Sequence, residues 1–139
     1  MTADIRVAGD HDLAFLGAHD QHIARGELDA VVSRGRVLVA VDGGTHLGWL
    51  RWGLFWDEVP FMNLLFVVEA GRGRGLGRLL VDDWGARMRH AGRARVMTST
   101  LSDESAQHFY RHLGYRDFGA LLLPGEATEL MLLKELTGR

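Results

Sequence analysis

The chain has 139 residues and no cysteine, and its 16 Lys and Arg residues nearly balance 18 Asp and Glu residues for a formal net charge of −2. This length suits one domain whose core needs no disulfide, and the missing cysteines exclude thiolate zinc sites and a cysteine nucleophile. The near-neutral charge argues against nucleic acid or an acidic membrane as a partner. The N-terminus lacks the order of a secretory signal and no apolar run approaches about 20 residues, so we expect a soluble, cytoplasmic protein.

Apolar stretches and turn residues alternate along the first half of the chain. They predict a strand at 5–8, two helices between 10 and 33 with a break near Gly26, strands at 36–41 and 47–55 joined by the turn Asp42-Gly43-Gly44, and a strand at 61–68.

The second half begins with the most regular pattern, a stripe of apolar residues at helical spacing from Leu76 to near Gly92. We then expect a strand at 96–99, a helix that Ser102 or Asp103 caps and Gly114 closes, and strands at 115–122 and 128–136. The order of these elements predicts an α+β or mixed α/β fold with helices on both faces of one sheet.

A glycine-rich segment joins the strand at 61–68 to the helix that begins at Leu76. Gly71, Gly73, Gly75 and Gly77 alternate with Arg72, Arg74, Leu76 and Arg78. Glycines allow positive φ angles and a close approach of ligand to backbone, and the first N–H groups of a helix attract anions. A P-loop is excluded because Lys134 is the only lysine, and Arg78 stands where a dinucleotide fingerprint has its third glycine. The segment predicts a pyrophosphate site, with a ligand-free connection as the alternative.

Two motifs in this order resemble the GNAT superfamily of N-acetyltransferases. Arg72-x-x-Gly75-x-Gly77 is similar to the family's Arg/Gln-x-x-Gly-x-Gly/Ala turn, and residues 103–110 are similar to its later Asn-x-x-Ala-x-x-Phe-Tyr helix. The resemblance implies a single acetyltransferase domain over residues 1–139, with a mostly antiparallel sheet of about seven strands and about four helices. It also implies acetyl-CoA as cosubstrate and no metal.

The same resemblance assigns the site residues. Tyr110 would donate a proton to the departing CoA thiolate, since a phenol of pKa about 10 is protonated at neutral pH; core packing is its alternative role. Asp103 stands where the family often has Asn, so a cofactor contact competes with helix capping. The residues expected to contact the cofactor are Leu65, Phe66, Val67, Val68, Arg72, Gly73, Arg74, Gly75, Leu76, Gly77, Arg78, Asp103 and Ala106. One backbone amide of residues 65–68 would polarise the thioester carbonyl.

No carboxylate stands where some relatives have a glutamate that deprotonates the amine. Asn63 lies in that place, nine residues before Arg72, and an amide can orient the amine but cannot act as a base. Glu58 is the first candidate to accept the proton through water, ahead of Asp57 and Glu69, and a solvated turn is the alternative. Direct attack in a ternary complex asks little of a base if the amine binds neutral.

The remaining features leave the acceptor open. Trp49, Trp52, Phe55 and Trp56 either line an acceptor pocket or pack on the sheet, and packing is preferred. A small amine, an aminoglycoside, an amino acid and a protein N-terminus all fit. A non-catalytic acyl-CoA-binding or ligand-sensing module is the alternative function. The resemblance also implies a homodimer through an edge strand near the C-terminus.

Overall fold

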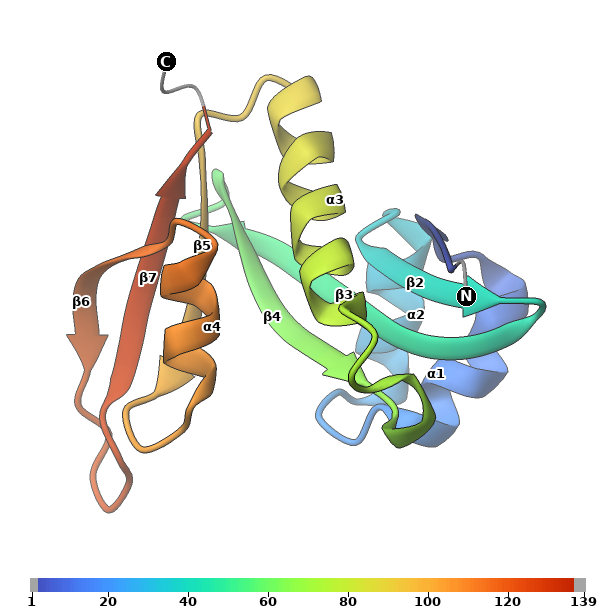
Figure 1. Cartoon of the computed structure of the whole chain (residues 1–139), viewed down its shortest axis with the longest axis horizontal. Coiled ribbons are helices and arrows are strands. Elements are labelled where there is room, and N and C mark those ends of the chain that lie inside the picture. The colour runs from blue at the N-terminus through green and yellow to red at the C-terminus, as the bar shows by residue number, and fades with distance from the viewer. Residues whose placement is uncertain (1–2, 137–139) are drawn as a thin grey trace. The chain divides into compact units, whose positions relative to one another are not determined.

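The computed structural model describes residues 3–136 and has the expected mixed α/β architecture (Figure 1). The elements in chain order are β1 (Asp4–Val7), the 3₁₀ helix η1 (Asp10–Asp12), α1 (Leu13–His19), α2 (Arg25–Ser33), β2 (Val37–Asp42), β3 (Thr45–Phe55), β4 (Val59–Val67), the 3₁₀ helix η2 (Glu69–Gly71), α3 (Leu76–His90), β5 (Arg95–Leu101), α4 (Ala106–His112), β6 (Arg116–Leu121) and β7 (Glu129–Glu135).

The strands form a seven-stranded sheet with the order β1-β2-β3-β4-β5-β7-β6. Strand β4 pairs with β5 in parallel, whereas β1 with β2, β2 with β3, β5 with β7 and β6 with β7 pair antiparallel. The prediction of a mostly antiparallel sheet with four α-helices is therefore confirmed. The chain divides into two compact units, Met1–Gly53 with Leu64–Trp84 and Leu54–Asn63 with Gly85–Arg139, so that β3, β4 and α3 each contribute to both.

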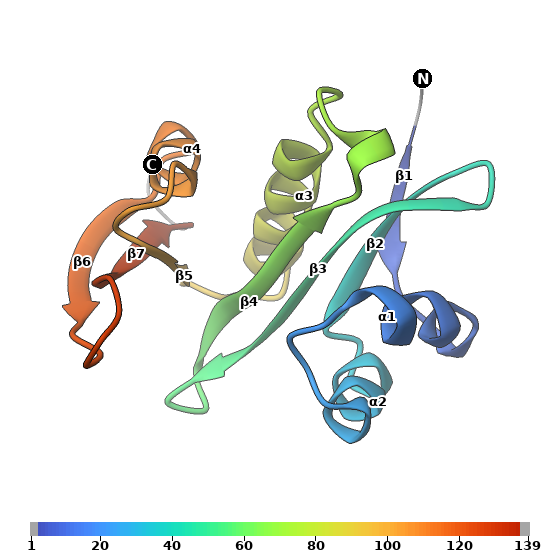
Figure 2. The same ribbon diagram turned by 90° about the horizontal axis from the view of Figure 1, so that it is seen from below.

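The core of the first unit lies between its helices and its strands. Figure 2 shows α1 and α2 on one face of β2 and β3 and α3 on the other. The buried side chains that pack together beneath α1 and α2 are Ala8, Leu16, Leu28, Val32, Val37, Val39 and Trp49. On the α3 face, the ring of Trp52 lies 6.3 Å from the ring of Trp84. Alternation along β3 thus sends successive tryptophans into opposite layers.

Glycines shape two features of this unit. Gly43 and Gly44 have φ angles of +56° and +88°, which confirms the predicted turn between β2 and β3. At Gly48 a Cβ atom would lie 2.8 Å from the carbonyl oxygen of Phe66, so a side chain there would push β3 and β4 apart. These strands approach closely because Gly48 has no side chain.

One sequence prediction in this region needs correction. The break between the first two helices is at residues 20–24, and Gly26 lies in the first turn of α2. The break lies there because tertiary contacts hold the connection in place: the Asp20 carboxylate accepts hydrogen bonds from the His22 amide and from Arg51. The predicted end of the next strand is confirmed, because β3 ends at Phe55; Trp56 and Asp57 after it have φ angles of +56° and +58°, and Trp56 is 79% exposed.

The second unit contains the antiparallel strands β5, β7 and β6 with α4 beside them (Figure 1). Strand β6 is the outer strand of the sheet and is exposed throughout. Helix α4 begins after Ser105 with no side-chain cap, so the predicted capping by Ser102 or Asp103 is wrong. The Gln107 amide donates to two carbonyls of the preceding turn and so ties that turn to the helix, but it does not cap the N–H groups of α4. The predicted end of the helix is confirmed, because Gly114 has a φ angle of +96°.

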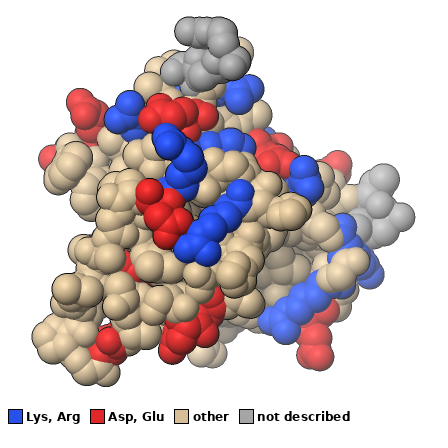
Figure 3. All heavy atoms as spheres, turned by 60° about the vertical axis from the view of Figure 1, so that its left-hand side comes forward, with Lys and Arg blue, Asp and Glu red and all other residues tan. Residues whose placement is uncertain are grey.

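Two further observations concern the distribution of charge on the surface and the hydrophobicity of the helices. On the face shown in Figure 3, basic and acidic side chains are interspersed rather than gathered by sign. Between residues 3 and 136, none of the helices combines the length and hydrophobicity that a membrane crossing requires.

Candidate active site

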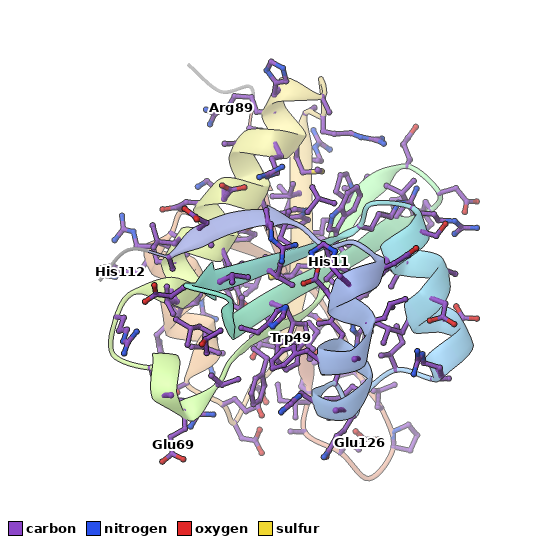
Figure 4. The ribbon with its side chains drawn as sticks, turned by 90° about the vertical axis from the view of Figure 1, so that its right-hand side faces the viewer. His11, Trp49, Glu69, Arg89, His112 and Glu126 are labelled. Atoms are coloured by element: carbon purple, nitrogen blue, oxygen red, sulfur yellow. The ribbon has the colours of Figure 1, made fainter. Side chains whose placement is uncertain are left out.

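The glycine-rich segment leads from the end of β4 through η2 to the first turn of α3. Gly71 is buried, and a Cβ atom there would lie 3.1 Å from the carbonyl oxygen of Leu47 and from a methyl group of Leu76. The absence of a side chain therefore lets the turn pass close against β3. Glu69 projects from the outer end of η2 (Figure 4).

The backbone that follows is open to solvent. Gly73 and Gly75 have φ angles of +77° and +74°, and nothing lies within 4 Å of the position of a Cβ atom at either residue. The amide of Leu79 donates to the carbonyl of Gly75 at 3.0 Å, which marks the first bond of α3. The three amides before it, at residues 76–78, therefore have no acceptor within the helix. With the positive end of a 15-residue helix beside them, these amides have the arrangement that favours an anion.

Three exposed arginines surround this backbone. The Nε of Arg72 donates to the carbonyl of Val67 at 3.1 Å, and its guanidinium carbon lies 5.8 Å from the ring centre of Phe66. The Nε of Arg78 lies 3.4 Å from the carboxylate of Asp82. Arg74 makes no hydrogen bond or ion pair to another residue of the described part of the chain. All three keep donors for a phosphate group.

The end of β4 offers fewer free amides than its sequence indicates. The amide of Val68 donates to the carbonyl of Leu47 at 2.9 Å, so it is already occupied by β3. Leu65 and Val67 are half-buried, and Phe66 is exposed. Among the residues expected to contact the pantetheine arm, Leu65 to Val67 therefore remain the better candidates for backbone contacts.

Tyr110 lies in the second unit, on α4, with only 7% of its surface exposed. Its hydroxyl donates to the sulfur of Met62 at 3.9 Å, and its ring contacts the rings of Phe109 and Tyr115. Burial raises the pKa of Tyr110 to about 12, and a hydrogen bond with Thr98 opposes this rise. The phenol is therefore protonated at neutral pH and has a proton to donate.

The other predicted residues of this unit lie at different places. Asn63 is exposed and follows Met62 on β4, so it lies next to the residue that the Tyr110 hydroxyl contacts. Glu58 precedes β4, and its carbonyl accepts a hydrogen bond from Arg93 at 2.9 Å. By strand rise, Glu58 is roughly 13 Å from Met62. Asp103 is exposed in the turn before α4, and Ala106 is the half-buried first residue of that helix.

The first unit has a cavity of about 180 Å³, for which the sequence offered Trp49 only as the less preferred alternative to packing and missed the other lining residues. It is lined by residues 19–22 of the connection between α1 and α2, by Trp49 of β3, and by Leu64 and Phe66 of β4. Alternation in β3 could have placed Trp49 and Arg51 on one face, but their shared partner Asp20 is 29 and 31 residues away in sequence. Within the described residues, no group of three or more His, Asp or Glu side chains could hold a metal ion.

Comparisons with known proteins agree with this architecture. The acetyltransferase (GNAT) domain family matches residues 33–117 of the chain. A comparison with curated proteins finds no match.

Several solved structures have the same fold at low sequence identity. Ard1 from Thermoplasma volcanium is similar with a TM-score of 0.84 and 15% identity, over 99% of this chain and 100% of that chain. The ribosomal-protein-S18-alanine N-acetyltransferase from Escherichia coli has a TM-score of 0.83 and 13% identity, over 99% and 96% of the two chains. The protein yncA from Salmonella typhimurium, solved with its cofactor acetyl-CoA, has a TM-score of 0.81 and 18% identity, over 100% and 96%. Because the family match spans more than half of its length, the chain belongs to the GNAT acetyltransferase family.

Proposed function

We propose that residues 1–139 act as one acetyl-CoA-dependent N-acetyltransferase domain, which moves an acetyl group to a primary amine by direct attack. The observation that supports this proposal most is the junction between β4 and α3. There, glycines with positive φ leave the backbone open where helical amides and arginines meet. Membership of the GNAT family and the acetyl-CoA bound to yncA agree with it.

The junction fits the pyrophosphate of CoA in charge and in shape. The open positions at Gly73 and Gly75 leave room for phosphate oxygens against the backbone, and Leu76, Gly77 and Arg78 would donate their amides. The side chains of Arg72, Arg74 and Arg78 would add charge-assisted hydrogen bonds. Along β4, backbone groups of residues 65–67 would hold the pantetheine arm, and one amide there would stabilise charge on the carbonyl oxygen. Asp103 and Ala106 would contact the cofactor at the start of α4.

Acetyl-CoA supplies the acetyl group as an activated thioester. Tyr110 would give its phenolic proton to the departing sulfur, for which its raised pKa keeps the proton in place until charge develops. Asn63 would orient the amine, and water would accept the amine proton, with Glu58 as a more distant acceptor. Positioning of the two substrates then contributes much of the acceleration.

A second candidate function is a non-catalytic acyl-CoA-binding module. It is favoured by Asn63, an amide at the position where some relatives have a glutamate base. The two functions share the cofactor site and differ only in turnover.

Calorimetric titration with acetyl-CoA and CoA tests the shared part. Arg78→Ala should weaken binding at least about tenfold, because it removes a charge-assisted bond to phosphate. Arg25→Ala is the matched control, since Arg25 forms the same exposed i, i+4 pair with an aspartate on α2. Arg72→Ala and the double change Gly75→Ala with Gly77→Ala should also weaken binding. No binding by the folded wild type would contradict both functions, and binding without acetyl transfer to any of a panel of amines would favour the module.

A further inference from the structure

The cavity between the α1–α2 connection and the strands has aromatic and aliphatic side chains on the strand side, and residues 19–22 of the connection, which are polar or charged, on the other side. The rings of Trp49 and Phe66 lie 5.0 Å apart with an angle of 30° between their planes, and Leu64 adds an aliphatic wall. Figure 4 shows Trp49 between the strands and α1. The cavity volume is about 180 Å³, and a cavity of about 150 Å³ with apolar walls is large enough to bind benzene. The cavity therefore has room for one ring.

The carboxylate in the cavity wall has no capacity left for a cation. Asp20 is fully buried and accepts hydrogen bonds from Trp49 Nε1 at 3.1 Å, from Arg51 Nε at 2.7 Å and Nη2 at 3.4 Å, and from the His22 amide at 3.1 Å. Although burial by itself raises the pKa of Asp20, the bonds from Arg51 and the His22 amide hold it below its usual range. The Asp20 carboxylate is thus ionised, and Arg51 already balances its negative charge. An ammonium group placed in the cavity would lose water and gain no free counter-charge.

The same hydrogen bonds make the cavity rigid. Arg51 Nη2 also donates to the carbonyl of His22 at 3.3 Å, so Arg51 binds both the backbone of the connection and the side chain of Asp20. Because Trp49 is held by its indole N–H, the aromatic wall is fixed before any ligand arrives. A preformed wall lowers the entropic cost of binding a rigid ring.

Strand β4 connects this cavity to the glycine-rich junction. The side chains of Leu64 and Phe66 line the cavity, and the residues between and after them on the same strand are those proposed for the pantetheine arm. The guanidinium of Arg72 lies against the Phe66 ring and binds the carbonyl of Val67. A ring in the cavity would thus lie beside the strand that is proposed to hold the thioester.

We infer that this cavity selects the acceptor, and that the preferred acceptor is a primary amine carrying one uncharged aromatic ring. Polyamines are poor ligands, because their second ammonium group finds no free carboxylate here. The inference rests on the proposed function, since it assigns the acceptor of that reaction.

Binding of simple amines tests the inference without any turnover. The probes are phenethylamine, n-butylamine as its ringless counterpart, and spermidine, and the signal is the indole N–H of Trp49 in a nitrogen–proton correlation spectrum. The signal is assigned by its loss in Trp49→Phe. Phenethylamine should shift it with an affinity about tenfold or more above that of the other two amines. Equal or tighter binding of spermidine, or no shift with phenethylamine, would overturn the inference.

Two variants of the exposed Phe66 test the contribution of its ring and of charge at this position. Phe66→Ala should weaken phenethylamine binding about tenfold, whereas Trp56→Ala, which removes an exposed ring in the other unit, should leave it unchanged. Phe66→Glu adds a free carboxylate and should shift the preference toward spermidine. Retention of the phenethylamine preference in Phe66→Glu would contradict the charge argument.

Acetyl-CoA titrated into the same samples separates the two proposals. Binding of acetyl-CoA without binding of phenethylamine would remove the inference and leave the proposed function standing. Binding of phenethylamine without acetyl-CoA would support the cavity as a ring-binding site and contradict the proposed function.

Discussion

Removal of the Tyr110 hydroxyl should lower the rate of acetyl transfer strongly and the stability of the fold only slightly. The hydroxyl donates to the thioether of Met62 at 3.9 Å, and a thioether is a weak acceptor. Tyr110→Phe keeps the ring contacts and removes only this weak bond and the hydrogen bond with Thr98, so it should lower the free energy of unfolding by no more than about 2 kcal/mol. If Tyr110 is the acid, the same change should lower kcat by about 100-fold or more, which corresponds to roughly 2.7 kcal/mol of activation free energy.

The assay is the rate of thiol release from acetyl-CoA with a saturating amine, beside urea unfolding of each variant. Tyr115→Phe is the matched control, since Tyr115 is the only other tyrosine and is also buried. Because burial raises the pKa of Tyr110 to about 12, its deprotonation should cause no fall in kcat between pH 6 and about pH 10. A Tyr110→Phe variant that is folded, binds acetyl-CoA and keeps kcat within about twofold of wild type would refute the assignment.

Four further outcomes follow from single contacts. Glu58→Gln should leave kcat within about twofold, because roughly 13 Å of strand separates it from Met62; a fall of 100-fold or more would identify Glu58 as the base. Gly48→Ala should lower the free energy of urea unfolding by about 1–3 kcal/mol, because the new Cβ would lie 2.8 Å from a carbonyl oxygen of β4. In the same assay, Asp20→Ala should cost about 3–5 kcal/mol by leaving a buried guanidinium unpaired, and a loss below about 1 kcal/mol would contradict that. Hydrogen bonds from Arg6 hold the pKa of Asp12 far below the unfolded value of about 3.9, so the stabilisation from the ionised carboxylate is present above that pH and lost as pH falls further. Asp12→Asn should therefore flatten the acid side of a plot of unfolding free energy against pH.

Some elements could be predicted from the sequence because residues close together in the chain determine them. The turn at Gly43 and Gly44 was predictable because paired positive φ angles are nearly a glycine property. Helix α3 was predictable because its apolar stripe is long and a glycine follows its end. In both cases the deciding residues lie within a few positions of one another.

The break between α1 and α2 and the start of α4 could not be predicted correctly from the sequence. The helix break was expected at Gly26, yet glycine is tolerated in the first turn of α2, and the connection at 20–24 is held by Arg51. The cap of α4 was expected from Ser102 or Asp103, yet Gln107 satisfies carbonyls of that turn from inside the helix. The first error comes from a contact that is distant in sequence, whereas the second comes from a competing hydrogen bond within the same turn.

This difference explains why the family could be predicted from the sequence and the acceptor could not. The proposed cofactor contacts lie largely in one continuous segment, where backbone amides bind phosphate whatever the rest of the fold contains. The cavity draws its walls from three separate segments, and its charge depends on whether Asp20 meets Arg51. Had that carboxylate been free, the same aromatic walls would favour an ammonium group. The inferred acceptor preference therefore depends on the tertiary contact between Asp20 and Arg51, and substitutions of Arg51 should change this preference while the cofactor motif stays intact.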